Sequence, residues 1–202
     1  EIPLEQVLSI DFFTVHPQAY WEWFAQENAR EGVAPNAAHR FVASLEQDGK
    51  LSAVVTQNID GLHQRAGSKR VLELHGNWSR LTCTGCGEHF TLNDVDDARS
   101  GSVPHCPTCA SVLRPDIVFY GEMLDSDVIE GAVRAITEAD LLIVAGTSLV
   151  VHPAAGLIDY YTGERLVLMN ATSTPYDSRA DLIIREPVGQ VFHELERLRP
   201  RP

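Results

Sequence analysis

The sequence has no apolar run approaching the roughly 20 consecutive residues that a membrane span needs. Its first residues, Glu1-Ile2-Pro3-Leu4, also lack the basic region and apolar stretch of a secretory signal. We therefore expect no membrane partner, and a reducing, cytoplasmic setting is the simplest prediction.

Positive charge is scarce as well. Lys and Arg total 16 against 28 Asp and Glu, which gives a formal net charge of -12. An acidic surface repels phosphates, so nucleic acid is a poor candidate partner, whereas a protein substrate rich in Lys and Arg is weakly favoured. The 202 residues, of which 44% are hydrophobic, are enough for one core and a small second module.

Short apolar runs without polar alternation, typical of strands buried on both faces, alternate with helical segments along most of the chain. This alternation predicts a parallel α/β sheet. Expected strands are 51–56, 140–145, 165–170 and 182–184. Expected helices are 15–30, 37–47 with Asn36 as cap and Gly49 as stop, 130–138, 153–161 and 188–198. Parallel sheets bind ligands at the carboxyl ends of their strands. We predict a nucleotide at three such ends, residues 56–58, residues 146–148 and Asn170.

All the cysteines fall in two matched pairs. They are Cys83, Cys86, Cys106 and Cys109, with 19 residues between the pairs. This spacing is typical of a four-cysteine zinc site, and four thiolates leave no open position, so the zinc would be structural. Disulfides or a redox pair are the alternatives, which a reducing setting disfavours. His105 adjoins the second pair, and we expect it to be a spectator.

Four motifs surround the cysteine pairs in a fixed order. They read T-Q-N-I-D-G-L-H at 56–63, E-L-H-G-N at 73–77, R-P-D-I-V-F-Y-G-E at 114–122 and G-T-S-L-V-V-H-P-A-A at 146–155. Together they resemble the sirtuin family, from about Pro35 to the last helix. One motif alone would mean little, but four of them around paired cysteines are specific.

The resemblance implies a Rossmann-like parallel sheet over residues 1–77 and 114–202, with a zinc-ribbon module, 78–113, inserted into it. Sirtuins begin this sheet with a strand and a Gly-Ala-Gly-x-Ser turn, and neither has a counterpart in this sequence. The strand would be central, so we expect its two neighbours to lack a shared partner.

The resemblance also implies an activity, the NAD-dependent removal of acyl groups from protein lysine. Nicotinamide leaves as the acyl oxygen attacks the ribose, and a general base then activates a ribose hydroxyl. The products are lysine, nicotinamide and O-acyl-ADP-ribose. His75 matches the general base, a role that suits histidine because its ordinary pKa lies near neutrality. A hydrogen-bonded structural histidine is the alternative.

Further roles are implied residue by residue. Asn58 matches a residue that positions the ribose and a water, and it shares the NAD site with Gln57, Ile59, Asp60, Gly146, Thr147, Ser148, Asn170 and Val188. The acylated-lysine peptide would lie along Val118, Phe119, Tyr120, Gly121, Glu122 and Val151. Ordinary turns after strands, and core packing, are the alternatives for these two sets.

Three functional questions stay open from sequence. Sirtuins that prefer acidic acyl groups carry a Tyr-x-x-Arg pair where this chain has Phe24-Ala25-Gln26-Glu27, so we expect a neutral acyl group, acetyl first. NAD glycohydrolase or ADP-ribosyl transfer on the same scaffold is an alternative activity. A non-catalytic zinc-ribbon binding module is the alternative of another class.

Overall fold

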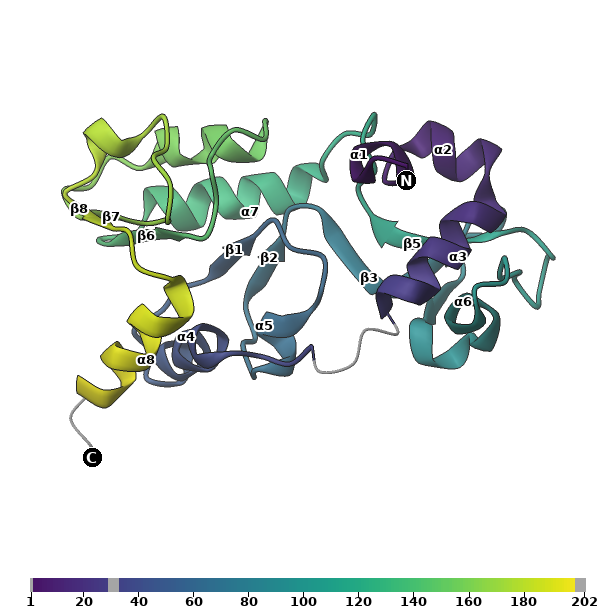
Figure 1. Ribbon diagram of the computed structural model, residues 1–202, viewed down its shortest axis with the longest axis horizontal. Coiled ribbons are helices and arrows are strands. Elements are labelled where there is room, and N and C mark those ends of the chain that lie inside the picture. Colours follow the sequence, from purple (N-terminus) through teal and green to yellow (C-terminus); the bar gives the residue numbers. More distant parts are fainter. Residues whose placement is uncertain (1, 29–32, 199–202) are drawn as a thin grey trace. The chain divides into compact units, whose positions relative to one another are not determined.

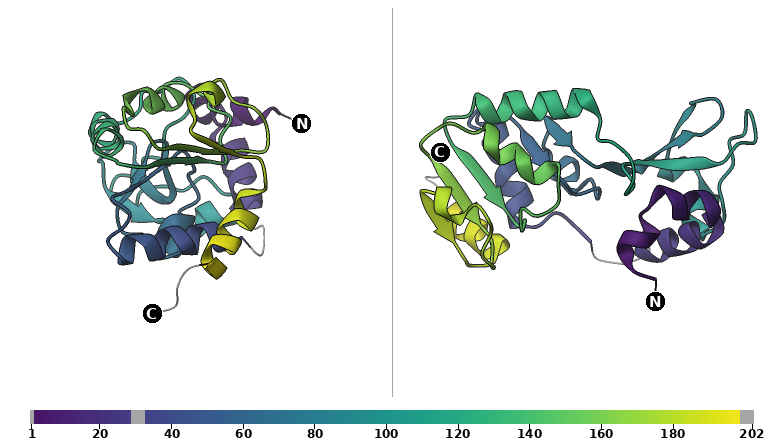
Figure 2. Two further views of the ribbon diagram at one scale, coloured as in Figure 1. Left: turned by 90° about the vertical axis from the view of Figure 1, so that its left-hand side faces the viewer. Right: turned by 90° about the horizontal axis from the view of Figure 1, so that it is seen from above.

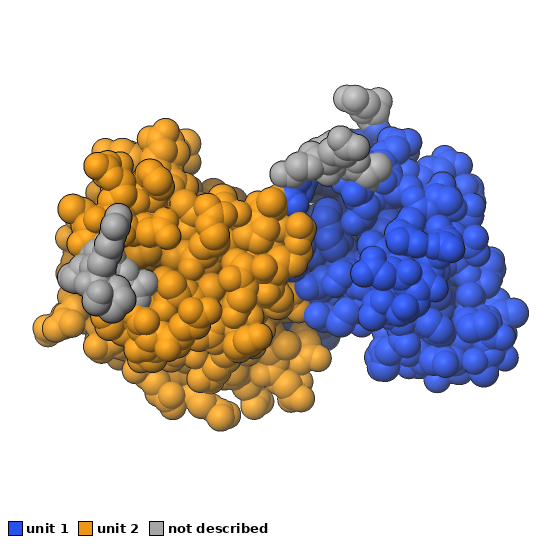
Figure 3. All heavy atoms as spheres, turned by 90° about the horizontal axis from the view of Figure 1, so that it is seen from below, with its two compact units in different colours: residues 1–33, 58–61, 75–124 blue, residues 34–57, 62–74, 125–202 orange. Residues whose placement is uncertain are grey.

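The computed structural model describes residues 2–28 and 33–198, and it divides into two compact units (Figure 3). The first unit comprises residues 1–33, 58–61 and 75–124. The second comprises residues 34–57, 62–74 and 125–202. No helix in the described part is long and apolar enough to cross a lipid bilayer.

The second unit contains two parallel sheets (Figure 1). Strand β1 (Val54–Thr56) pairs with β2 (Val71–Glu73). Strands β6 (Leu142–Ala145), β7 (Leu166–Met169) and β8 (Leu182–Ile184) form the other sheet in that order. Among the described strands, β1 pairs only with β2 and β6 only with β7. The parallel sheet that the sequence predicts is therefore present, but it is interrupted between β1 and β6.

Helices cover both sheets of this unit. They are α4 (Ala37–Gln47), α5 (Leu62–Arg65), α7 (Ser126–Thr137) and α8 (Val188–Leu198), with 3-10 helices η2 (Ala154–Tyr160) and η3 (Asp177–Arg179). Figures 1 and 2 show α7 on one side of the β1–β2 sheet and α4 on the other. Helices α4 and α8 pack together, with the rings of Phe41 and Phe192 5.5 Å apart.

One core underlies both sheets of the second unit. Its buried residues include Leu74, Ala132, Leu157 and Leu168, and partly buried Val55 and Val144 pack against it. Since Val55 lies in β1 and Val144 in β6, the two sheets share this core although no strand pairing joins them among the described residues.

The first unit combines helices with an antiparallel sheet. The helices are α1 (Leu4–Val7), α2 (Ile10–Val15), α3 (Pro17–Asn28) and α6 (Asp96–Ser100), with a 3-10 turn η1 (Leu92–Asp94). Strand β3 (Gly76–Cys83) lies between β4 (His89–Thr91) and β5 (Leu113–Ile117).

Aromatic side chains fill the core of the first unit. Phe13 stacks on Phe119 with ring centroids 5.1 Å apart, and Tyr20 meets both rings edge-on at 5.0 and 5.5 Å. Cys83 and Cys106 are buried in the same cluster. The paired cysteines are therefore attached to a core that the N-terminal helices build.

Local signals located several elements well. The predicted bounds of β8, α4 and α8 are confirmed, and Asn36 caps α4 by accepting a hydrogen bond from the His39 N–H. Strands β1, β6 and β7 begin later than predicted, and β7 also ends one residue earlier, at Met169. The helix predicted at 153–161 is the 3-10 helix η2. The helix predicted at 15–30 corresponds to α3, which begins at Pro17, because Val15 ends α2. The predicted end, Arg30, lies outside the described residues.

The contacts divide the chain differently from the predicted boundaries at residues 78 and 113. Strands β3 and β5 each run across one of these positions, and they pair with one another. Helices α1, α2 and α3 also contribute buried side chains to the cluster that contains Cys83 and Cys106. The unit around the cysteines is therefore larger than the predicted insertion.

Candidate active site and metal centre

The four cysteine sulfurs form one compact group. All four Sγ atoms lie within 4.8 Å of one another, and the distances Cys83–Cys109 and Cys86–Cys106 are 3.3 and 3.7 Å. All four cysteines are free thiols. A tetrahedron with Zn–S bonds of about 2.3 Å has S–S edges of roughly 3.8 Å, close to these distances.

The backbone around the sulfurs is fitted to this arrangement. The N–H groups of Gly85 and Cys86 both point to Cys83 Sγ at 3.4 Å. A Cβ atom at Gly85 would lie 2.2 Å from Ser111 Oγ, so only glycine fits the first turn without displacement. His105 remains outside the group, with Nδ1 3.0 Å from the Ala110 carbonyl oxygen.

The thiols do not ionise equally, because their hydrogen-bond partners differ. Hydrogen bonds from Ser111 lower the pKa of Cys109 to about 6. A backbone hydrogen bond at Glu88 lowers the pKa of Cys86, but its thiol neighbours, Cys83 first, oppose this and raise it to about 12. Crowded thiolates need a cation to offset their charge, so the four cysteines fit a structural zinc ion.

His75 lies where the parallel strand β2 leads into the antiparallel strand β3. The preceding Leu74 N–H donates to Thr56 O at 2.9 Å, and Val118 N–H donates to His75 O at 3.0 Å. Gly76 has φ +76°, and a Cβ there would lie 2.0 Å from Asp116 O. The backbone on both sides of this partly exposed histidine is thus fixed by its neighbours.

The segment Asn58–Gly61 is held beside the same strand. Trp78 N–H donates to Ile59 O at 3.1 Å, and the Ile59 side chain packs on the core of the first unit. Asn58 is exposed and Asp60 is partly exposed. The structure therefore places Asn58, Ile59 and Asp60 in the same unit as His75, on a neighbouring segment.

Other predicted NAD residues follow the strands of the second unit. Gly146 comes directly after β6, and its N–H donates to Met169 O at 2.9 Å, while Asn170 follows β7 and donates to Ile184 O at 3.0 Å. Gly146 has φ +68°, and a Cβ added there would meet no atom within 4 Å. Thr147 Oγ1 accepts from Leu149 N–H at 3.2 Å, and Ser148 is exposed. Gly146 and Asn170 thus share one sheet edge.

Two remaining NAD candidates lie elsewhere in this unit. Gln57 follows β1 and is partly exposed, and Val188 is the first residue of α8. The structure therefore distributes the predicted NAD residues over both units, with Asn58, Ile59 and Asp60 in the first and the others in the second.

Sequence reasoning missed Arg185, which holds the turn that carries Asn170. Arg185 Nη1 donates to the carbonyl oxygens of Asn170 at 3.0 Å and Thr172 at 2.8 Å, and its other Nη pairs with Asp177. A lone arginine after a strand gives no sequence signal for this role, because its partners lie up to 15 residues away.

The segment predicted to bind the peptide, residues 118–122, is held by hydrogen bonds at several positions. Val118 is partly buried, Phe119 is 1% exposed, and Tyr120 is 50% exposed. Tyr120 N–H donates to Leu8 O at 2.8 Å, and Tyr120 O accepts from Ile10 N–H at 3.1 Å. Gly121 is exposed with φ +95°. Val151, exposed as well, belongs to the second unit.

The Glu122 side chain faces inward to the same segment. Arg114 donates to both of its carboxylate oxygens, at 2.7 and 2.8 Å, and Phe119 N–H donates to Oε2 at 3.0 Å. Sequence reasoning assigned Arg114 no role. The signal was present, because Arg114 and Glu122 begin and end one motif, but spacing alone does not show that they pair.

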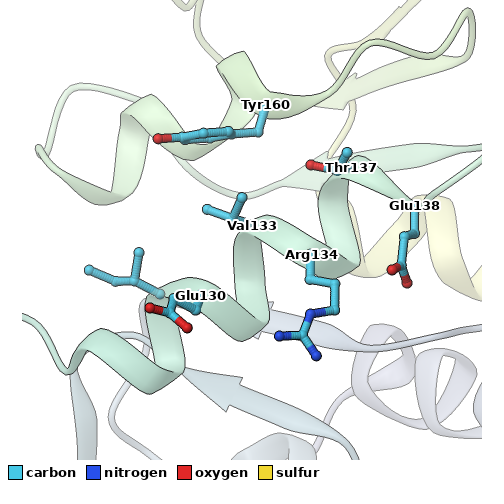
Figure 4. Close-up of a pocket in the computed structure, with 7 residues that line it drawn as sticks. Glu130, Val133, Arg134, Thr137, Glu138 and Tyr160 are labelled. Carbon is cyan, nitrogen blue, oxygen red and sulfur yellow. The ribbon is translucent and has the colours of Figure 1, made fainter.

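A separate hollow of about 530 Å³ lies between α7 and Tyr160 of η2 (Figure 4). Glu130, Val133, Arg134 and Glu138 line it from the helix, and Tyr160 lies across from them. None of the predicted site residues contributes to it, so we do not place the active site there.

Comparison with known proteins agrees with this arrangement. The sequence model of the Sir2 family matches residues 3–153. An NAD-dependent protein deacetylase of Clostridium acetobutylicum is 48% identical over 190 residues, covering 94% of this chain and 77% of the relative. A solved structure of Sir2 bound to an acetylated peptide is 42% identical with a TM-score of 0.88, covering 96% of this chain and 83% of that chain. A Sir2 complex with p53 peptide and NAD+ is 41% identical with a TM-score of 0.85, covering 98% and 85%.

Proposed function

The chain belongs to the Sir2 family, and on this basis we propose that it is an NAD-dependent protein-lysine deacetylase. The observation that carries the proposal is the grouping of His75, Asn58 and Asp60 in one unit with a four-cysteine zinc site. Named relatives with this activity span nearly the whole chain, and solved relatives bind acetylated peptide and NAD+.

We assign His75 as the general base that removes a proton from a ribose hydroxyl. An imidazole can accept and return a proton near neutral pH, and the fixed backbone around Gly76 limits how far the ring can move. Asn58, one segment away, positions the ribose and a water. Both assignments rest on the family motif and on the shared unit.

NAD supplies the ribose that accepts the acyl group and the nicotinamide that leaves. We propose that Gln57, Asn58, Ile59, Asp60, Gly146, Thr147, Ser148, Asn170 and Val188 hold it. Exposed backbone and hydroxyl groups after β6 suit phosphate or ribose oxygens, because the carboxyl ends of parallel strands are the usual nucleotide sites.

The peptide substrate is read mainly through its backbone. We propose that it lies along Val118–Glu122 and Val151, with Val118, Tyr120 and Val151 contacting the lysine stem and acyl group. Phe119 contributes through the backbone, since its ring is buried in the core. The acidic chain, with net charge -12, favours basic peptides.

We propose that the enzyme prefers to remove a neutral acyl group from lysine. Phe24 is fully buried in the aromatic core, and neither Gln26 nor Glu27 offers a cation for an acidic acyl group. A higher kcat/KM on succinyl-lysine than on acetyl-lysine peptide would contradict this preference. We place the reaction in the cytoplasm, where thiols stay reduced and available for zinc.

The test is incubation of the chain with NAD and an acetyl-lysine peptide, followed by mass spectrometry of the peptide and of O-acetyl-ADP-ribose. We expect deacetylation that requires NAD and falls at least ~100-fold in the His75→Ala variant. Full activity in that variant would remove His75 from its role.

A second measurement separates the alternative activities. Nicotinamide release that does not depend on peptide would indicate an NAD glycohydrolase or ADP-ribosyltransferase. Failure to bind either NAD or peptide would indicate a non-catalytic zinc-ribbon module.

A further inference from the structure

Arg114 makes several contacts in the first unit in addition to its ion pair with Glu122. Its guanidinium donates to both oxygens of Glu122 and also to Ile117 O at 3.1 Å. Its Cζ atom lies 5.0 Å from the centre of the Phe119 ring. A planar, two-pronged contact of this kind fixes geometry as well as charge.

Glu122 passes this constraint to the backbone of the turn. Its Oε2 accepts from Phe119 N–H at 3.0 Å, and its own N–H donates to Phe119 O at 3.0 Å. Hydrogen bonds from Arg114 hold the pKa of Glu122 below its usual range, so the carboxylate stays ionised at neutral pH. The two side chains are both about one-quarter exposed.

The constrained turn leaves the backbone of Gly121 exposed. Tyr120 uses both of its peptide groups on Leu8 and Ile10, whereas Gly121 makes no backbone hydrogen bond within the described part of the chain. A side chain at Gly121 would meet Ile10 Cγ2 at 3.2 Å, and φ is +95°. Gly121 is therefore an exposed backbone position of this turn that can pair with an extended ligand.

We propose that Arg114 is a positioning residue for the peptide substrate, acting through Glu122 to hold residues 118–122 in the arrangement that pairs with an extended peptide backbone. This inference rests on the proposed deacetylase function. It assigns a role in peptide affinity, and none in NAD binding or in the chemical step.

The experiment compares Arg114→Gln, Arg114→Lys and Glu122→Gln with the unaltered chain. A fluorescein-labelled acetyl-lysine peptide reports peptide affinity, calorimetry reports NAD affinity, and initial rates give KM and kcat. Arg99→Gln is the matched control, because it removes an exposed arginine–carboxylate pair of the same unit, Arg99 with Asp96, away from this turn.

In Arg114→Gln we expect peptide affinity to fall about tenfold and KM for peptide to rise equally, with kcat changed less than about threefold. NAD affinity and zinc content stay unchanged. Arg114→Lys restores part of the loss, since it keeps the charge but not the fork. The Arg99→Gln control matches the unaltered chain in every measurement.

Two results would overturn the inference alone. The first is unaltered peptide affinity in Arg114→Gln. The second is an equal loss of peptide affinity and NAD affinity in that variant, which would mean that the substitution unfolds the chain. If the unaltered chain binds no acetyl-lysine peptide, the proposed function is wrong as well, and the two failures are thus distinguished.

Discussion

Gly76 is the residue at which the candidate catalytic histidine is joined to the zinc-bearing sheet. Its φ is +76°, and a Cβ added there would lie 2.0 Å from Asp116 O, which leaves no space for a side chain. The neighbouring atom is backbone, so it cannot rotate away. This glycine lets β3 lie against β5 immediately after His75.

Substituting Gly76→Ala should therefore destabilise the chain by more than ~2 kcal/mol, through the left-handed backbone and the displaced strand. Gly189→Ala is the control, since no atom lies within 4 Å of its added Cβ and its backbone is not left-handed. That variant should be neutral or gain up to ~1 kcal/mol in α8. Urea unfolding measures both, and equal midpoints would contradict the argument.

Arg185 gives a second prediction at this scale. It holds the carbonyls of Asn170 and Thr172, and it helps to lower the pKa of Asp177, whose first cause is the Thr174 hydroxyl. Arg185→Gln should loosen this turn and weaken NAD binding by about five- to tenfold, while peptide affinity is retained. Calorimetric titration with NAD checks this, and unchanged affinity would show that the turn does not hold the nucleotide.

The four-cysteine site and helices α1, α2 and α3 are expected to unfold together because they share one core. Cys83 and Cys106 are buried among the same side chains as Trp21 and Phe24. All three tryptophans, Trp21, Trp23 and Trp78, belong to the first unit. Tryptophan fluorescence therefore reports on this unit and not on the parallel strands.

Removing zinc with a strong chelator should unfold the first unit and move tryptophan emission to longer wavelengths, since the crowded thiolates lose their cation. Re-adding Zn²⁺ should restore the emission, whereas Mg²⁺ should not, because it prefers oxygen ligands. Emission that does not change on complete metal removal would mean that the core holds without zinc.

Elements whose signals are local could be predicted from the sequence. The helix cap of α4 at Asn36 and the apolar runs of β6 and β7 can each be recognised from a few consecutive residues. Strand β2 was missed because it directly follows Lys69 and Arg70 and ends in the charged Glu73, so no continuous apolar run marks it as one marks β8. Strand β5 was missed because it pairs with β3, which lies about 30 residues earlier in the sequence. No periodicity in the sequence indicates a pairing between strands so far apart.

The candidate site divides in the same way. The metal ligands follow from spacing alone, and His75 follows from its motif. Arg114 and Arg185 could not be assigned, because their roles depend on which carbonyls and carboxylates the fold brings to them. Helices α1 and α2 place Val7, Phe12 and Phe13 in the same core as the cysteine-bearing sheet, and no helical pattern in the sequence reveals these contacts.

On the scale of the whole molecule, the open edge of β6 affects how separate molecules associate. Strand β6 is apolar, and Ile143 within it is 37% exposed. Its edge away from β7 has no strand partner among the described residues. Peptide groups on such an edge are hydrated in water, and a strand of another molecule can replace that water.

We expect self-association that grows with protein concentration and is reduced by Ile143→Lys, because a charge on an edge strand opposes intermolecular pairing. Val15→Lys is the control, since Val15 is 67% exposed but lies at the end of a helix. Light scattering across a dilution series measures both variants. Equal scattering per unit mass at every concentration would rule out pairing through this edge.

The open edge of β6 thus affects the behaviour of the protein in solution as well as the architecture of its sheet. In solution, dispersion of the molecules then depends on their concentration, or on whether another chain covers this edge.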